Sequence, residues 1–249
     1  MLVLLPPSET KRAGGRRTPL AIDALCLPGL TASRERVIDA LVALSADEEQ
    51  AARVLKLSVA QRGQIAVNAA VRDGPTLPAI DRYTGVLYDA LDAASLSAAA
   101  RRWLGGSVLI HSAPFGPVGA LDRIPEYRLG AGVSLPGLAS LRTVWADAVT
   151  SAITAAGPSF VLDLRSEAYV ALGPLPSAVP ATYVRVVREG ADGAVRALNH
   201  FNKHAKGTLV RRLAETRPRI GSLRSLRAWA DAEAMTLRPG AAGELNLVV

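Results

Sequence analysis

Apolar and polar positions along the chain change from strand-like to helix-like patterns several times. Leu2–Leu5 is an apolar run that stops at two prolines, which predicts a buried strand ending in a loop. Apolar residues spaced by three and four predict helices over 33–44 and 138–156. Short apolar runs at 107–112 and 160–164 predict two further buried strands.

The remaining segments are shorter, but most still carry a helix or strand pattern. They predict helices over 45–57 (opened by a capping box from Ser45 to Glu48), 59–72, 96–104, 203–213 and 222–234, a hairpin of 182–188 with 194–201 around a turn at 189–193, and a closing strand over 245–249. No repeat or long linker divides the chain. We therefore expect one α+β domain over residues 1–249, a mixed β-sheet surrounded by helices.

Composition narrows the class of protein. Of the 249 residues, 49% are hydrophobic and 20% charged, which is typical of a folded globular chain. The single cysteine, Cys26, cannot form an internal disulfide, and this favours a reducing, cytoplasmic compartment. No apolar run approaches the roughly 18 residues that cross a membrane. No dinucleotide fingerprint, phosphate-binding loop or zinc spacing is present, so we expect no cofactor, no metal and no membrane partner.

Positive charge is concentrated towards the C-terminal end. The chain has 29 basic and 22 acidic residues, and the stretch 196–227 holds nine of the basic residues against one acid, Glu215. Such a field attracts a phosphate-rich partner, because neutralised phosphates release counterions. The arginines over 217–227 are interpreted as coating a helix.

The most specific part of this stretch contains two of the four lysines. Lys203 and Lys206 are three residues apart and share a helix face, with Arg211 further along it. Gly207 permits a close backbone approach or tight helix packing. Such a face either follows a phosphate backbone without reading its sequence or is a solvated helix face with a packing glycine.

Two other polar clusters have a functional and a structural interpretation. Arg128 clamps a phosphate that Asp122 orients, or the two form a buried salt bridge beside Tyr127. Ser166 and Glu167 follow the strand at 160–164, and ligand sites gather at the carboxyl ends of strands; a serine followed by glutamate is also a natural helix start.

Glycine and histidine positions point more strongly to structure. The segment 115–119, with Gly116 and Gly119, predicts a plain turn rather than a phosphate-binding hairpin, since Pro117 removes a donor. His111 lies in an apolar strand and is interpreted as a core residue. His200 and His204 are four apart, but the helix is expected to begin after His200, which disfavours a metal site.

Six blocks in one order resemble the YaaA family of peroxide-stress proteins. They contain Thr10 and Lys11; Tyr83, Gly85 and Tyr88; Gly116, Asp122, Tyr127 and Arg128; Trp145; Ser166, Glu167 and Tyr169; and Lys203, Lys206, Gly207 and Arg211. This chain departs from the family at Gly119-Ala120, where an Arg-Pro pair is common, and at Lys206, where arginine is usual. The resemblance implies a cytoplasmic DNA-binding protein that limits peroxide damage, with a helix-hairpin-helix-like element and a basic cleft.

Three functions follow as hypotheses. The first is a non-enzymatic protein that binds duplex or distorted DNA without strong sequence preference, with phosphates held by Lys11, Arg128, Lys203, Lys206 and Arg211. The second is an enzyme acting on a nucleotide or nucleic acid, which requires eight side chains to meet in one pocket: Lys11, Tyr83, Asp122, Arg128, Ser166, Glu167, Lys203 and Lys206. The third is a scaffold that binds a protein through its basic face.

Overall fold

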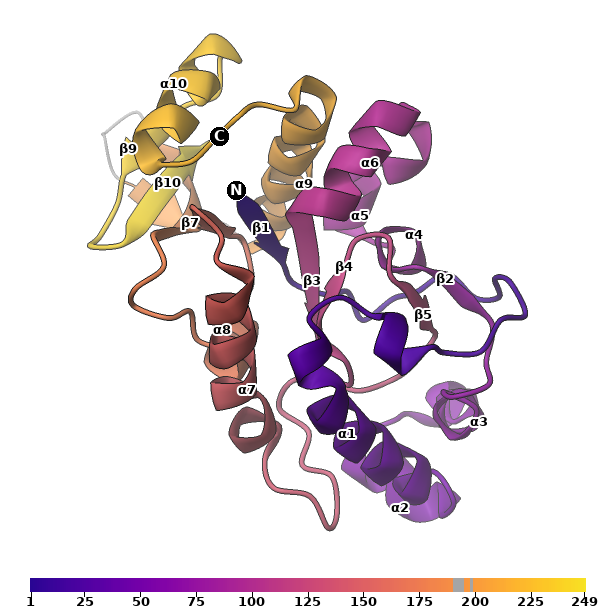
Figure 1. The fold of residues 1–249 in the computed structure, drawn as a ribbon. Coiled ribbons are helices and arrows are strands. Elements are labelled where there is room, and N and C mark those ends of the chain that lie inside the picture. The colour runs from indigo at the N-terminus through magenta and orange to yellow at the C-terminus, as the bar shows by residue number, and fades with distance from the viewer. Residues whose placement is uncertain (190–194, 198) are drawn as a thin grey trace.

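The computed structural model describes residues 1–189, 195–197 and 199–249, and it confirms a mixed sheet surrounded by helices (Figure 1). The strands are β1 (Leu2–Leu5), β2 (Thr76–Pro78), β3 (Val108–Ser112), β4 (Gly116–Gly119), β5 (Arg123–Pro125), β6 (Val161–Asp163), β7 (Ala181–Glu189), β8 (Val195–Ala197), β9 (Leu237–Pro239) and β10 (Glu244–Val248). The α-helices are α1 (Thr31–Leu44), α2 (Glu48–Val54), α3 (Gly63–Ala69), α4 (Ala79–Arg82), α5 (Val86–Leu91), α6 (Ala98–Ser107), α7 (Leu141–Ala156), α8 (Glu167–Leu172), α9 (Asn199–Thr216) and α10 (Leu223–Ala232).

The main sheet is parallel in its centre and antiparallel at its edges. Its order is β4-β3-β1-β6-β7-β10-β9, and β8 pairs with the far end of β7. Every pair from β3 to β10 is parallel, whereas β4 and β9 run antiparallel to their neighbours. Strands β2 and β5 form a separate two-stranded sheet. An apolar run such as β1 suits a central parallel strand, because both of its faces are covered.

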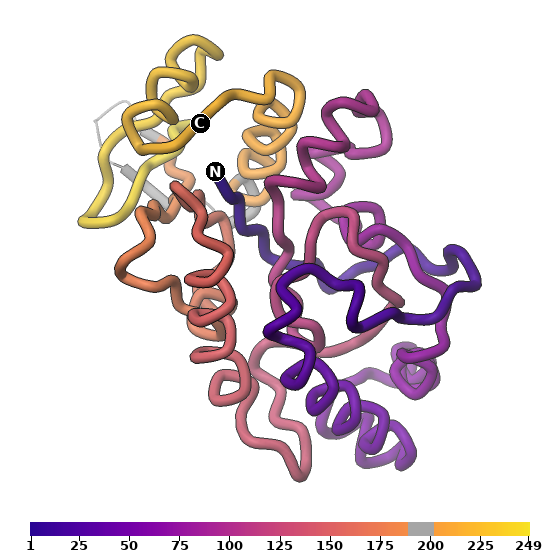
Figure 2. The backbone as a smooth tube through the Cα atoms, in the orientation of Figure 1, coloured from indigo at the N-terminus to yellow at the C-terminus, as the bar shows by residue number. Residues whose placement is uncertain are grey.

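Helices pack in two groups. Helix α9 contacts α5, α6 and β7, whereas α7 contacts α1, α8 and β4. The tube in Figure 2 shows that the C-terminal segment with α10, β9 and β10 lies on the opposite side of the view from the loop that follows β1. None of the helices in the described ranges is long and apolar enough to cross a bilayer.

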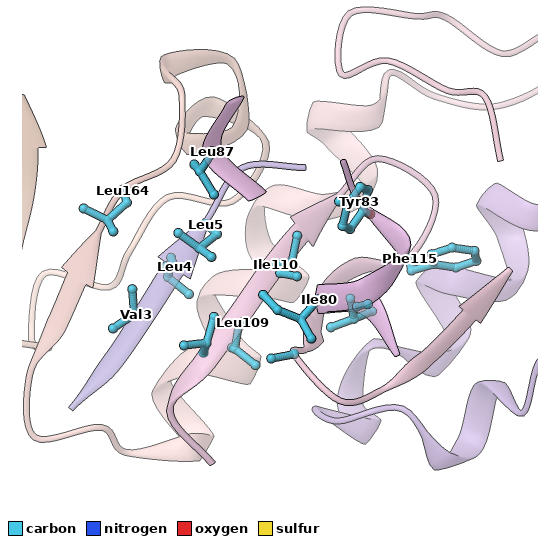
Figure 3. Packing of buried hydrophobic residues seen from close by; sticks show 14 of the residues in the cluster. Val3, Leu4, Leu5, Ile80, Tyr83, Leu87, Leu109, Ile110, Phe115 and Leu164 are labelled. Atoms are coloured by element: carbon cyan, nitrogen blue, oxygen red, sulfur yellow. The ribbon is translucent and has the colours of Figure 1, made fainter. Parts of the chain in front are cut away.

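The core surrounds β1 and β3. Leu4 and Leu5 pair in register with Leu109 and Ile110 of β3, and Figure 3 shows these side chains with Tyr83 and Phe115 beyond them. Leu5, Ile110 and Phe115 are completely buried. Tyr83 packs into this core, and its hydroxyl makes a buried hydrogen bond with that of Tyr127, so the ring is held in place.

Several predicted elements are confirmed, and three need correction. Helices α1 and α7 and strands β1, β3, β6 and β10 lie within two or three residues of the predicted ranges. The predicted helix 59–72 is instead a 3-10 turn at Val59–Gln61 followed by the shorter α3. Helix α6 continues through both glycines to Ser107. The N-cap of α2 is Asp47, whose carboxylate accepts the Gln50 N–H at 2.9 Å, and not Ser45.

The predicted hairpin is correct in its pairing and wrong in its second boundary. Strands β7 and β8 pair antiparallel, but β8 ends at Ala197 and α9 already begins at Asn199. His200 and His204 therefore lie on the same helix, contrary to the expected start after His200. Most of the predicted turn, at 190–193, lies outside the described residues.

Candidate functional site

The carboxyl ends of three neighbouring parallel strands lie side by side. We call this end of the sheet its carboxyl edge. Strand β1 lies between β3 and β6, with Leu4 in register with both Leu109 and Asp163. The loop after β1 carries Lys11, and the loop after β6 carries Arg165. Ligand sites in parallel sheets form at these carboxyl ends, so this edge is the first place to look for chemistry.

Lys11 is held at this edge by backbone and aromatic groups. Its Nζ donates to the carbonyl oxygens of Ser8 at 3.1 Å and Glu9 at 3.3 Å. The same nitrogen lies 4.1 Å from the ring centroid of Tyr127 and 5.6 Å from that of Tyr83. Burial lowers the pKa of Lys11 to about 7, with a further contribution from the Arg128 guanidinium. A lysine that is neutral for part of the time near pH 7 is uncommon and is typical of reactive sites.

The tyrosines around Lys11 form a hydrogen-bonded cluster. The hydroxyls of Tyr83 and Tyr127 lie 2.7 Å apart, and the rings of Tyr83 and Tyr88 have centroids 5.2 Å apart. Tyr88 donates to the carbonyl oxygen of Pro6 at 2.7 Å. Burial raises the pKa of all three phenols. All three therefore remain protonated near neutral pH, with Tyr88 donating to Pro6 and one of Tyr83 and Tyr127 donating to the other.

Thr10 and Gly85 join the loop after β1 to the segment before α5. The Thr10 hydroxyl donates to the carbonyl oxygen of Thr84 at 3.2 Å, and the Thr84 N–H donates back to the Thr10 carbonyl at 3.2 Å. Gly85 has φ 93°, and a Cβ there would lie 3.2 Å from the Thr10 hydroxyl. Glycine at this position lets the two segments approach closely enough to fix Lys11 beside Tyr83.

Arg128 reaches the same edge and has an acidic partner. Its guanidinium lies 3.3 Å from the Glu9 carboxylate, and its backbone is fixed by the Asn68 side chain. Glu9 is largely exposed, so the pair is open to solvent and its net energy is small. A phosphate can compete for Arg128 by displacing Glu9.

A second, buried group lies at the end of β6. Arg165 and Asp163 form an ion pair at 2.6 Å, with side chains 0% and 4% exposed. Arg165 also meets Nδ1 of His111 at 3.0 Å. Since a guanidinium can only donate, Nδ1 accepts and the proton of the neutral ring lies on Nε2. His111 is thus a core histidine as predicted, although its Nε2 has no hydrogen-bond partner among the described residues.

Tyr169 lies near both the group around Lys11 and the group around Arg165. An ion pair between α8 and β7 lies next to it in the chain. The ring centroid of Tyr169 lies 5.8 Å from that of His111, and Glu9 is among the groups that raise its pKa, after burial. Ser166 and Glu167 are exposed at the start of α8. Glu167 pairs with Arg185 at 3.3 Å, so the charges of these two side chains balance each other.

Lys206 points inwards, whereas Lys203 is exposed. Lys206 is 4% exposed and its Nζ lies 5.3 Å from the ring centroid of Tyr183. Burial lowers its pKa to about 8, with Arg185 lowering it further and Asp163 opposing the shift. The boundary of the buried face therefore falls between these two lysines.

Gly207 and Arg211 join α9 to α5. A Cβ at Gly207 would overlap the carbonyl oxygen of Leu87. Arg211 donates to the carbonyl oxygens of Leu91 at 3.1 Å and Asp92 at 3.2 Å, where α5 ends. These contacts give both residues a structural role in helix packing.

The central glycine turn is buried and its polar groups are occupied. Asp122 accepts the N–H groups of Gly119 and Cys26, each at 2.8 Å, and is not in contact with Arg128. Gly116, with φ 62°, packs on the ring of Trp145, where a Cβ would lie 2.8 Å from the nearest ring carbon. Residues Gly116–Gly119 form strand β4 rather than a free turn, and the segment reaches the Lys11 cluster only through the Phe115 ring among the contacts described, whose centroid lies 5.4 Å from that of Tyr127 in an edge-to-face arrangement.

Three residues that organise this region were missed in the sequence. Arg34 is fully buried and donates to the carbonyl oxygens of Phe115, Pro117 and Cys26. Asp163 and Arg165 form the buried ion pair. An aspartate inside the apolar run Phe160–Leu164 is the one feature of the sequence that could have indicated it, because a buried carboxylate needs a partner.

Known proteins resemble the chain over most of its length. The family described as peroxide stress protein YaaA matches residues 1–237. A UPF0246 protein of Streptomyces coelicolor is 48% identical over 218 residues, which are 87% of this chain and 84% of that protein. Relatives from Corynebacterium efficiens (45% identity, 88% of this chain and 86% of that protein) and Corynebacterium glutamicum (40% identity over the whole of both chains) carry the same UPF0246 description.

Proposed function

Because the chain belongs to the peroxide stress protein YaaA family, as its motifs predicted, we propose that it acts in the peroxide response by binding nucleic acid. The observation that supports this proposal is a group of unpaired arginines around α10. Arg217, Arg219, Arg224 and Arg227 are exposed, and none of them forms an ion pair with another residue that the structure describes.

Other basic residues of the stretch 196–227 are already paired or buried, which strengthens the choice of these four arginines. Arg211 pairs with Glu215 at 2.9 Å, and Arg212 pairs with Glu215 and Glu233. Lys206 is buried. Phosphates therefore meet Arg217, Arg219, Arg224 and Arg227 without first displacing a carboxylate of the residues that the structure describes.

Helix α10 presents two of these arginines together. Arg224 and Arg227 are three residues apart and line a shallow groove with Leu223, Ala228 and Asp231. A guanidinium binds phosphate through two parallel hydrogen bonds. Two arginines spaced along one helix face can contact successive phosphates of a nucleic-acid backbone. Such contacts do not read the bases, so binding should depend little on sequence.

The test is a salt titration of binding to duplex, single-stranded and mismatched DNA. We expect affinity to fall steeply with salt, and Arg224→Gln/Arg227→Gln to reduce the slope of log K against log salt by about 2, at roughly 0.9 per lost phosphate contact. Arg62→Gln/Arg72→Gln is the matched control, because it removes the same charge from arginines that pair with Glu49, Glu35 and Asp39. If the α10 variant binds like the parent, the assigned surface is wrong.

The helix-hairpin-helix-like element, the basic cleft and the cytoplasmic location implied by the resemblance stay predictions. An enzymatic function is the second candidate, and Lys11 is the observation that favours it. Lys11 is a neighbour of Tyr83 and Arg128, and Asp122 instead accepts hydrogen bonds from Gly119 and Cys26. The experiment that tests an enzymatic function measures the reactivity of the Lys11 amine.

A further inference from the structure

Lys11 combines a desolvated amine with access from solvent. The residue is half-buried, and its neighbours Glu9 and Thr10 are exposed. Of the other lysines, Lys206 is buried and Lys56 and Lys203 are exposed. Only Lys11 has its amine enclosed by aromatic rings at the edge of the sheet and still borders open surface.

The groups around Lys11 disfavour the ammonium form on balance. Arg128 and Arg82 repel a positive charge, Glu126 and Glu9 attract one, and burial exceeds each of these effects. The carbonyl oxygens of Ser8 and Glu9 orient the nitrogen. A lysine that is desolvated and lies next to another cation is the usual form of a nucleophilic amine.

The rings of two protonated tyrosines enclose this amine. Tyr83 and Tyr127 share a hydrogen bond of 2.7 Å, and their rings flank the Lys11 nitrogen. Phenols that stay protonated can donate a hydrogen bond to a carbonyl oxygen and polarise it.

We propose that Lys11 forms an imine with an aldehyde, and that the aldehyde is C1′ of the open-chain deoxyribose left in DNA where a base has been lost. The amine lone pair attacks the carbonyl carbon and a C–N bond forms. The carbonyl oxygen then leaves as water, carrying the two amine hydrogens, and a C=N bond remains. No electrons are gained or lost.

The choice of a DNA aldehyde rests on the proposed nucleic-acid binding, whereas imine formation by Lys11 does not. A sugar without its base is easily turned out of a duplex, because there is no pairing and little stacking to lose. Arg128 lies beside Lys11 and can hold a flanking phosphate once Glu9 is displaced.

The experiment traps the imine by reduction. The full-length protein is incubated at pH 7 with a duplex containing one abasic site, with an intact duplex, or with free glyceraldehyde, and sodium borohydride converts any imine to a stable secondary amine. Peptide mapping by mass spectrometry then locates the adduct in the wild-type protein. We expect the abasic duplex to be attached at Lys11, and the intact duplex to give no adduct.

Variants give an independent check. Lys11→Arg keeps the charge but cannot form an imine, and it should lower the trapped fraction by more than about tenfold. Lys56→Arg, at an exposed lysine, should leave trapping unchanged. A thermal melt shows whether Lys11→Arg folds, and the peptide map of the wild type decides the matter if it does not.

The outcomes separate this inference from the proposed function. No adduct, or an adduct spread evenly over the four lysines, overturns imine formation at Lys11. Trapping of glyceraldehyde at Lys11 without trapping of the abasic duplex overturns the DNA aldehyde as partner. The glyceraldehyde arm tests Lys11 without any DNA, whereas the salt titration of Arg224→Gln/Arg227→Gln tests the proposed function without Lys11, so the two failures are distinguishable.

Discussion

Gly207 of α9 and Leu87 of α5 pack backbone to backbone, with no room for a side chain between them. A Cβ at position 207 would overlap the Leu87 carbonyl oxygen and lie 2.9 Å from the Cβ of Ala90. Arg211 fastens the same helix pair one turn later by donating to the carbonyl of Leu91. This contact between α5 and α9 therefore supports Tyr88, which lies in α5, and the preceding segment with Tyr83.

Gly207→Ala should therefore destabilise the protein by about 2 kcal/mol or more, because neither backbone can move without disturbing the packed helices. Urea denaturation measures the free energy of unfolding. Gly106→Ala in α6 is the control, since a Cβ there meets nothing within 4 Å. That change should be neutral or stabilising by up to about 1 kcal/mol. Equal effects of the two substitutions would contradict the packing argument.

Asp163→Asn should cost about 3–5 kcal/mol of unfolding free energy, because it leaves the buried Arg165 guanidinium without its counter-charge. Glu49→Gln removes a carboxylate from an exposed pair with Arg62 and should change the free energy of unfolding very little, because solvent screens the pair. Chemical denaturation of both variants at pH 7 provides the comparison. A loss for Asp163→Asn as small as that for Glu49→Gln would show that the interior tolerates the unpaired charge.

Lys206 should make stability depend on pH in the alkaline range. Its pKa falls from 10.5 to about 8 on folding, so the unfolded chain binds more protons between pH 8 and pH 10.5, and stability rises with pH across that window. The gain over a Lys206→Met variant should be of the order of 3 kcal/mol at most. Paired urea titrations at pH 7.5 and pH 10 measure it. A difference between the two proteins that stays constant with pH would exclude a depressed pKa.

Cys26 should not respond to hydrogen peroxide. Burial, and after it the Asp122 carboxylate, raise the pKa of this thiol to about 12, so almost no thiolate is present at neutral pH. Labelling with a sulfenic-acid probe after peroxide treatment should give no adduct in the native protein, whereas protein treated in urea should react. Rapid labelling of the native protein would mean that the thiol is a sensor after all.

The sequence predicted the elements whose apolar pattern is local, such as β1, α7 and β6. It did not predict β4, because Gly116–Gly119 with Pro117 has no strand pattern of its own; pairing with β3 at the sheet edge makes it a strand. Likewise, α9 begins earlier than expected, at Asn199, because its N-terminal residues are polar and lack periodicity.

The sequence predicted which residues belong to the candidate site better than it predicted what each residue does there. The motif blocks contained Lys11, Tyr83, Tyr127 and Arg128, which meet at one edge. Spacing alone could not show that Lys206 points inwards while Lys203 is exposed, because two positions three apart on a helix can lie on either side of its buried boundary. Nor could it show that Arg211 is bound to the end of α5, a contact between residues more than a hundred positions apart.

The position of β1 between β3 and β6 has a consequence for synthesis on the ribosome. Strand β1 leaves the exit tunnel before both of its neighbours, which are complete only when residues 108–112 and then 161–163 have been made. At typical elongation rates of roughly 5–20 residues per second, an apolar segment waits for several seconds or more without its sheet. Nascent chains are therefore expected to need a holding chaperone at their N-terminal end, and the native sheet to close only late in translation.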